Sequence, residues 1–274
     1  MEPIHSSVLM CVYGGDQSEW LEDALRSLLS QSLPPDEIVL VKDGPVSDSL
    51  DRVIDRAAGE FAGDFRVHAL DTNLGLVAAL NAGLGLCRGE LVFRMDADDV
   101  ADRERIARQT AFMDTHPEIG VLGSAMQEFS DSADNPLRLK PVKSEHHDIQ
   151  RQLVWRNPVN HPTVCLRRTA IPAEGYPSLQ YLEDYFLWAR LMASGVRFHN
   201  LAEPLLSYRF NDRTLARRSG WVNFRNEVYL RRWIYRHRLA GPVATAASIV
   251  LQAGLRFAPR GIQRRLWMST RRRI

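Results

Sequence analysis

Short apolar runs alternate with amphipathic stretches along the first third of the chain. Each of four apolar runs ends at a turn or polar loop, which predicts buried strands over residues 6–13, 37–41, 65–70 and 90–95. Apolar residues recur at helical spacing between these runs, which predicts helices over residues 19–31, 47–61 and 76–87. Strands that alternate with helices form right-handed βαβ units, so the predicted fold class is α/β, with a mixed, mostly parallel sheet flanked by helices.

The alternation becomes less regular after residue 102. The polar segment 130–145 contains Pro136 and Pro141, and it is predicted as a long loop of the kind that often carries a binding function. Around it the pattern predicts helices up to about residue 116, over 149–155 and over 181–192, and strands over 119–129, 163–166, 196–199 and 205–210.

Three carboxylates follow the fourth predicted strand directly, at Asp96, Asp98 and Asp99. Ligands of α/β proteins bind beyond the carboxyl ends of such strands. Crowded carboxylates repel one another, and oxygen ligands of this kind suit Mg²⁺ or Mn²⁺, which take their remaining ligands from water and substrate phosphates. The stretch therefore predicts a cation site, although a solvated turn before an acidic helix start is the alternative that these residues leave open.

The charge of the chain is divided unevenly, although the formal net charge is only +2. Residues 213–274 carry 15 arginines and a single acid, whereas residues 1–212 carry a net charge of −12. Arginines alternate with aromatic residues on a predicted long helix, and residues 239–255 are uncharged. This pattern favours a helix lying on an anionic membrane surface. A solvated helical tail and a nucleic-acid contact are the alternatives, and the acidic remainder of the chain argues against nucleic acid.

The three cysteines, Cys11, Cys87 and Cys165, lie in apolar surroundings without metal-ligand spacing. This usage predicts a reducing compartment and neither a disulfide framework nor a zinc site. The chain opens without a basic segment followed by an apolar one, so no signal peptide is expected and the cytoplasm is the predicted location. Together with the basic tail, this predicts a peripheral position on the inner face of the cytoplasmic membrane.

Several short motifs follow one another along residues 6–210. They are the apolar run 8–13, Lys42-Asp43-Gly44, Asn73-x-Gly75, Asn81-x-Gly83, Asp96-Ala97-Asp98-Asp99, Asn160-His161-Pro162-Thr163 and Glu183-Asp184-Tyr185-x-Leu187-Trp188. In this order they resemble the family 2 (GT-A fold) inverting glycosyltransferases, in particular bacterial enzymes that build surface polysaccharides. The resemblance implies a GT-A-like domain over residues 6–212, with a nucleotide-sugar half at about 6–116 and an acceptor half at about 117–212. Residues 213–274 form the Arg-rich helical tail.

The activity that the resemblance implies is transfer of a sugar from a nucleoside-diphosphate sugar to a hydroxyl of a saccharide or polyprenyl-linked saccharide. A divalent cation, Mg²⁺ or Mn²⁺, would neutralise the diphosphate leaving group. By resemblance, Asp98 is the direct metal ligand and Asp96 lies near the ribose and the metal. Asp99 is either a second ligand or the cap of the next helix.

The resemblance also assigns the contacts to the nucleotide sugar. Asp43 is the nucleobase contact, with an Asp-Gly turn residue as the alternative on spacing alone. Val12 and Tyr13 end the first strand and would flank the base, with core packing as the alternative for Val12. Asn73 and Gly75 open a helix whose N-terminus would face phosphate or base, with a plain turn as the alternative.

On the acceptor side, the resemblance makes Asp184 the general base that takes the proton from the attacking hydroxyl. Glu183 and His161 are predicted to line the acceptor pocket. Acids at a helix N-terminus are favourable without any catalytic role, and a buried structural histidine is the alternative for His161.

Three positions depart from the common pattern of the family. Gly14, Lys42 and Leu80 stand where many members have Asn, Asp and Arg. Lys42 or Arg94 is therefore the candidate to supply the positive side chain that is missing at position 80.

Two alternative functions remain at this point. Asp96-x-Asp98-x-Val100 also fits a Mg²⁺-dependent phosphatase motif, although that motif normally ends the first strand of its domain. A catalytically silent membrane-bound scaffold of the same fold is the other.

Overall fold

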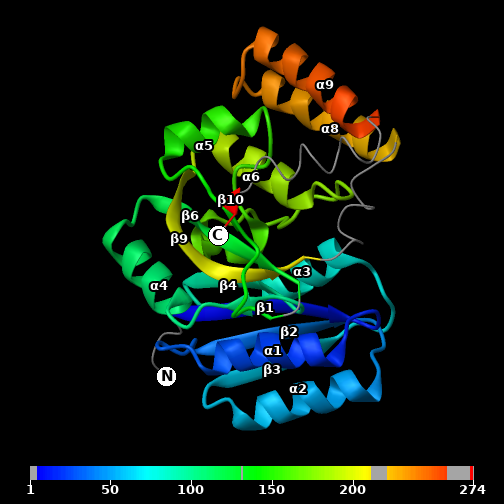
Figure 1. Cartoon of the computed structure of the whole chain (residues 1–274), viewed down its shortest axis with the longest axis vertical. Coiled ribbons are helices and arrows are strands. Elements are labelled where there is room, and N and C mark those ends of the chain that lie inside the picture. Colours follow the sequence, from blue (N-terminus) through cyan, green and yellow to red (C-terminus); the bar gives the residue numbers. More distant parts are fainter. Residues whose placement is uncertain (1–4, 131, 211–220, 258–271, 274) are drawn as a thin grey trace.

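The computed structural model describes residues 5–130, 132–210, 221–257 and 272–273. Its centre is a block of four parallel strands in the order β3-β2-β1-β4 (Figure 1). The strands are β1 (Ser6–Tyr13), β2 (Glu37–Asp43), β3 (Asp64–Ala69) and β4 (Leu91–Asp96). The four strands predicted from the apolar runs are thereby confirmed. β1, β2 and β4 are buried on both faces and mostly apolar, whereas β3 is the edge strand and is partly exposed.

Helices cover both faces of this block. On one face lie α1 (Ser18–Leu29), α2 (Asp48–Glu60) and α4 (Arg105–Thr115), and on the other lie α3 (Leu76–Leu86) and α6 (Glu183–Ala193). Successive side chains of β1 point to opposite faces, so Met10 packs in the first core and Leu9 in the second. A side chain at Gly83 of α3 would meet Leu9 within 2.2 Å, so this glycine allows the helix to lie close on the sheet.

Beyond β4 the sheet becomes mixed. The additional strands are β5 (Val100–Ala101), β6 (Ile119–Phe129), β7 (Arg138–Lys140), β8 (Cys165–Arg167), β9 (Arg197–Arg209) and β10 (Arg272–Arg273). β8 runs antiparallel between β4 and β6, and β6 pairs with β9 in parallel. The predicted α/β class with a mixed sheet and flanking helices is confirmed.

Two predictions about this half were wrong in detail. The segment 130–145 is not a plain loop, because β7 within it pairs with β6. Residues 196–199 and 205–210 were expected as two strands, but β9 is one strand whose pairing with β6 shifts register between Leu201 and Pro204. Proline has no N–H to donate to a sheet, so the pairing skips residues there without ending the strand.

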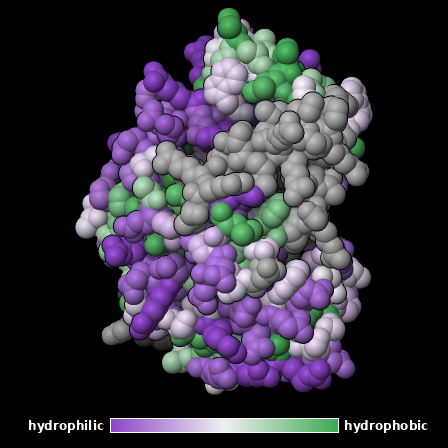
Figure 2. Space-filling view, in the orientation of Figure 1, coloured by the Kyte–Doolittle hydropathy of each residue, from purple (hydrophilic) through white to green (hydrophobic). Residues whose placement is uncertain are grey.

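The described part of the C-terminal region forms a helical hairpin. α8 (Trp221–Arg236) and α9 (Pro242–Phe257) lie at the top of the molecule, beside α5 (His146–Leu153) and α6. Hydrophobic residues gather at the surface there (Figure 2). Leu230 and Ile234 of α8 are buried in the second core, so α8 is packed on the body and not solvated all round.

Within the described ranges, no helix has the length and apolar character needed to cross a bilayer.

Candidate active site

The register of the parallel strands brings the predicted nucleotide-sugar residues to one edge of the sheet. Tyr13, at the end of β1, lies opposite Asp43, at the end of β2. On the other side of β1, Cys11 lies opposite Asp96, at the end of β4. The carboxyl ends of these three strands therefore meet, as the crevice rule for α/β sheets requires.

Asp96, Asp98 and Asp99 form a tight acidic cluster at this edge. Their carboxylate oxygens lie within 4.8 Å of one another. Burial, together with the negative charges of Asp96 and Asp16, raises the pKa of Asp98 to about 7. Burial, together with the negative charges of Asp98 and Asp96, also raises the pKa of Asp99 well above its ordinary value. Oδ2 of Asp99 is buried with no hydrogen-bond donor in the described part of the chain, so the cluster fits a bound divalent cation.

Asp99 does not cap the helix that follows it, so that alternative was wrong. The N-cap position of α4 is Glu104. Oδ1 of Asp99 instead accepts a hydrogen bond of 2.9 Å from the backbone N–H of Arg209. The Nε of Arg209 donates to the carbonyl oxygen of Asp98 at 3.0 Å. No sequence pattern pointed to Arg209, because its contact with the acidic loop spans 110 residues.

Arg94 is the cation that lies beside the cluster. Its Nη2 donates to Oδ1 of Asp96 in a buried ion pair. Burial opposes its charge, but Asp96 outweighs burial and raises the pKa of Arg94. Two further N–H groups of Arg94, Nε and Nη1, are buried without a partner in the described ranges. Lys42, the other candidate, instead pairs with Asp51 of α2 at 2.6 Å.

Asp43 forms hydrogen bonds with the loop that precedes α3. Its Oδ1 accepts from the backbone N–H of Leu74 at 2.7 Å, and its Oδ2 accepts from that of Gly75 at 3.0 Å. The side chain of Asn73 donates to the Asp43 carbonyl at 3.2 Å. The structure thus joins three predicted donor-site residues, Asp43, Asn73 and Gly75, through one set of hydrogen bonds. This arrangement accounts for Asp43 structurally, while its contact with a nucleobase stays a prediction.

The two predicted residues at the end of β1 differ in environment. Val12 is 1% exposed and belongs to the first core, as the packing alternative proposed. Tyr13 is 36% exposed, and its ring lies over Gly15, where a Cβ would come within 2.5 Å of it. Of the two side chains, only that of Tyr13 is available to stack on a ligand.

Asp184 and Glu183 begin α6, as the sequence predicted. Oδ2 of Asp184 accepts a hydrogen bond of 2.6 Å from Nδ2 of Asn157, a residue that the sequence analysis did not select. Burial, together with the charge of Asp184, raises the pKa of Glu183 to about 7. The charges of Arg94 and Asp96 have a smaller effect on the pKa of Glu183.

His161 is buried behind this site. Its Nε2 lies 2.8 Å from the hydroxyl of Tyr176, and its ring packs edge-on against Trp188. Burial, with a smaller effect of Arg94, lowers the pKa of His161 well below its ordinary value, so the ring is neutral. Tyr176 is held in turn by Asn81 of α3, through hydrogen bonds of 2.7 and 3.0 Å. These contacts fit the structural alternative, and an acceptor contact by His161 stays a prediction.

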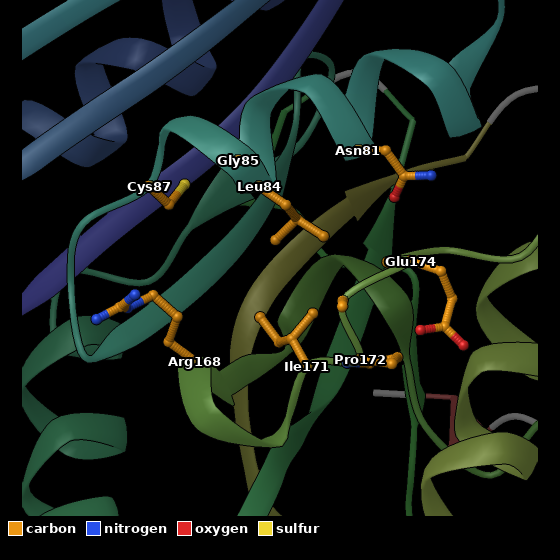
Figure 3. A pocket seen from close by; sticks show the side chains of 10 residues that line it. Asn81, Leu84, Gly85, Cys87, Arg168, Ile171, Pro172 and Glu174 are labelled. Carbon is orange, nitrogen blue, oxygen red and sulfur yellow. The ribbon is translucent and has the colours of Figure 1, made fainter.

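A cavity of about 310 Å³ lies between α3 and residues 168–175 (Figure 3). Its lining includes Leu84, Cys87 and Ile171, with Arg168 and Glu174 at either side. None of the residues predicted to bind donor, metal or acceptor lines it. The cavity therefore lies apart from the predicted donor, metal and acceptor residues.

Comparison with known proteins decides the family. The model of the family described as "Glycosyl transferase family 2" matches residues 7–173, more than half of the chain. This chain belongs to that family. The glycosyltransferase is also 40% identical to the amylovoran biosynthesis glycosyltransferase AmsE of Erwinia amylovora, over 85% of each chain. It is 30% identical to the UDP-Gal:alpha-D-GlcNAc-diphosphoundecaprenol beta-1,3-galactosyltransferase of Escherichia coli, over 98% of this chain and 97% of that one.

Solved structures share its architecture. S. aureus TarS in complex with UDP-GlcNAc matches with a TM-score of 0.66 at 20% identity, over 89% of this chain and 69% of that one. Mannosyltransferase PcManGT from Pyrobaculum calidifontis, in complex with GDP-Man and Mn²⁺, matches with a TM-score of 0.62 at 17% identity, over 97% and 84%. The predicted GT-A fold and glycosyltransferase class are confirmed, and the phosphatase alternative is wrong.

Proposed function

We propose that this glycosyltransferase moves a sugar from a nucleoside-diphosphate sugar to a hydroxyl of a saccharide or polyprenyl-linked saccharide, with inversion at the anomeric carbon. The observation that carries this proposal is the acidic cluster at the sheet edge, together with Asp184, which Asn157 holds in the first turn of α6. The names of the relatives support a role in surface-polysaccharide synthesis, and that of the E. coli enzyme supports a lipid-linked acceptor.

In this proposal Asp98 and Asp96 hold a divalent cation, with Asp99 as the buried third carboxylate. Mg²⁺ or Mn²⁺ bound there supplies the positive charge that stabilises the departing diphosphate. The Mn²⁺ named with PcManGT supports a metal of this class. Arg94 offsets part of the charge of Asp96, so the cluster does not carry three unbalanced negative charges before the cation binds.

The transfer forms one bond to the anomeric carbon and breaks one, and it moves one proton. The acceptor oxygen attacks the anomeric carbon, the bond from that carbon to the diphosphate oxygen breaks, and Asp184 accepts the hydroxyl proton. Attack from the face opposite the diphosphate inverts the configuration. Hydrogen bonds from Asn157 to Oδ2 and from the backbone N–H of Tyr185 to Oδ1 hold the Asp184 carboxylate in one orientation.

The remaining predicted residues take the two substrates. On the donor side, Tyr13 and Asp43 lie at the ends of adjacent strands, next to the loop of Asn73 and Gly75. We assign the nucleobase and ribose to these residues, with Val12 contributing its backbone. On the acceptor side, we assign Glu183 and, through the Tyr176 hydroxyl, His161.

We further propose that residues 6–212 perform the transfer while residues 213–274 attach the enzyme to the inner face of the cytoplasmic membrane. The excess of arginine in that region supports attachment to anionic lipid. A position there would bring the enzyme to a polyprenyl-linked acceptor.

The test is a panel of nucleotide sugars with Mg²⁺ or Mn²⁺, read first by thermal shift and then by sugar transfer. A bound donor stabilises the folded state, so the correct donor raises the melting temperature. Asp184→Asn should lower kcat by about 10²–10⁴-fold and leave donor affinity unchanged. The matched control is Asp148→Asn, at an exposed first-turn Asp of α5.

Two outcomes contradict the proposal. Unchanged transfer by Asp184→Asn removes the general base assigned here. A wild-type enzyme that neither binds nor turns over any nucleotide sugar in the presence of metal would instead be the silent scaffold.

A further inference from the structure

Helix α9 is packed with its polar side inward and its apolar side outward. Val243 and Val250 are 81% and 72% exposed, and Leu251 is 48% exposed. These residues and Ala247 fall on one side of the helix, because they repeat at intervals of three and four. The opposite side holds three buried polar residues, Thr245, Ser248 and Gln252. This is the reverse of the usual arrangement of a surface helix.

The inward side is fixed by hydrogen bonds to the body. The Ser248 hydroxyl donates to the carbonyl oxygen of Val154 at 2.5 Å and accepts from Nε of Arg231 at 3.1 Å. The side-chain amide of Gln252 donates to the carbonyl oxygen of Trp155 at 3.2 Å. Because these groups anchor α9 through its polar side, its apolar side can only face outward.

The exposed side of α8 has a complementary composition. Trp221, Arg225, Tyr229, Arg232 and Arg236 are all exposed and repeat at helical spacing. The only acid between residues 221 and 257 is Glu227, which is buried and paired with Arg231. The described hairpin thus presents arginines, aromatic rings and an apolar strip to its surroundings, and no exposed carboxylate.

We propose that the α8–α9 hairpin is a docking surface for an anionic lipid bilayer. The apolar side of α9 enters the boundary between headgroups and acyl chains, and the arginines of α8 contact anionic headgroups. Arginine charge is complementary to such lipids. In a symmetric dimer through the same patch, by contrast, each arginine cluster would meet its own copy, so a second chain is a poorer occupant. This inference rests on the proposed membrane attachment and assigns it to particular residues.

The docking surface is connected to the acceptor side of the active site. Phe186 of α6 packs edge-on against Tyr229 and Trp233 of α8, at 5.7 and 5.2 Å between ring centroids. The guanidinium of Arg231 lies 5.0 Å from the ring centroid of Tyr185, the residue that follows Asp184. A hairpin docked on lipid therefore holds α6, with Asp184 in its first turn, near the membrane, where a lipid-linked acceptor would be found.

The experiment uses the full chain with two exposed residues changed, Val243→Glu and Val250→Glu together. Deleting the hairpin is unsuitable, because Leu230 and Ile234 belong to the core. Binding is measured by co-sedimentation with phosphatidylglycerol/phosphatidylcholine vesicles and with phosphatidylcholine vesicles. We expect wild type to bind the anionic vesicles, and the double variant to bind them at least tenfold more weakly. The control is Val67→Glu, at an exposed position of β3, which should bind as wild type does.

A second variant tests the charge component. Arg232→Gln with Arg236→Gln should weaken binding to anionic vesicles several-fold and reduce its dependence on salt. Unchanged vesicle binding by the Val243/Val250 variant overturns the proposal. So does a wild-type dimer, seen by light scattering, that this variant makes monomeric, because the patch would then bind a second copy.

Donor binding is measured on the same samples by thermal shift with nucleotide sugars. We expect it to be unchanged in all variants, because none of the altered residues lies at the sheet edge. Failure of donor binding in wild type would contradict the proposed function and leave the lipid result interpretable on its own.

Discussion

The backbone N–H of Arg209 donates a hydrogen bond of 2.9 Å to Oδ1 of Asp99, although 110 residues separate the two in sequence. The Arg209 side chain adds a second bond, from Nε to the Asp98 carbonyl. Its guanidinium also lies over the rings of Trp20 and Phe129, at 5.1 and 4.6 Å from their centroids. The end of β9 therefore fixes the loop on which the proposed metal ligands stand.

Arg209→Ala should weaken Mn²⁺ binding by about tenfold, because groups that orient metal ligands typically contribute that much to affinity. The variant keeps the backbone bond to Asp99 and loses the bond to Asp98. It should also be less stable by about 1–3 kcal/mol, from the lost buried hydrogen bond and ring contacts. Calorimetric titration with Mn²⁺ measures the effect. Arg108→Ala, at an exposed arginine of α4, is the control, and equal affinity in both variants would refute the role of Arg209.

Asn157→Ala should lower kcat by about tenfold and leave the KM for the donor unchanged, because Asn157 orients Asp184 and is not assigned to the donor. Asn157→Asp should lower kcat further, since it places a second carboxylate beside Asp184. Steady-state kinetics with varied donor measures both. Asn135→Ala, at an exposed asparagine in the segment before β7, serves as control. A change confined to the donor KM would place Asn157 on the donor side instead.

The raised pKa of Glu183 predicts how stability depends on pH. Its folded-state pKa is about 7 against an ordinary value of 4.5, so the folded protein keeps a proton that the unfolded chain has released. Stability of the metal-free enzyme should therefore fall as pH rises through this window and level off above it. Glu183→Gln removes this contribution, so the variant should exceed wild type by about 1–2 kcal/mol at pH 8 and match it near pH 4.

Urea denaturation at several pH values measures this difference. Glu118→Gln, at an exposed glutamate, should show no such divergence from wild type. Parallel pH curves for Glu183→Gln and wild type would mean that the Glu183 pKa is not raised in the folded enzyme.

Gly44→Ala should destabilise the enzyme by about 2 kcal/mol or more and weaken donor binding. Gly44 has a φ of +82°, and a Cβ there would lie 2.5 Å from the backbone N of Asn73. The added methyl would thus displace the loop that Asp43 holds. Gly59→Ala in α2 is the opposite case, because it has open space and helical geometry, and it should stabilise by about 0.5–1 kcal/mol. Thermal denaturation of both variants tests the pair, and similar melting temperatures would contradict the strain at Gly44.

Leu230→Ala in α8 should cost about 2–5 kcal/mol, as expected for a large side chain removed from a core. Val250→Ala in α9 should change stability by less than about 0.5 kcal/mol, because Val250 is exposed. Urea denaturation compares the two. A negligible effect of Leu230→Ala would mean that α8 does not pack on the body in solution.

The sequence determined the fold class and the strands of the parallel block, because the central strands β1, β2 and β4 are buried on both faces and require apolar runs. It also located the acidic cluster, since three carboxylates within four residues are visible without any tertiary information. The second half was harder to predict. β9 was predicted as two strands because Pro204, where its pairing with β6 shifts register, is a residue that usually interrupts a strand. β7 was missed because it is short and half-buried.

Only the tertiary structure decided which groups surround those carboxylates. Arg209 and Asn157 carry no local signal, because each meets its partner through packing of elements that are distant in sequence. The same holds for the C-terminal hairpin. Its sequence gives an uncharged stretch between arginines, but hydrogen bonds from Ser248 and Gln252 to the body determine which side of α9 faces outward. The periodicity of the sequence shows which residues share one side of a helix. The packing of the rest of the chain decides whether that side contacts the protein or the solvent.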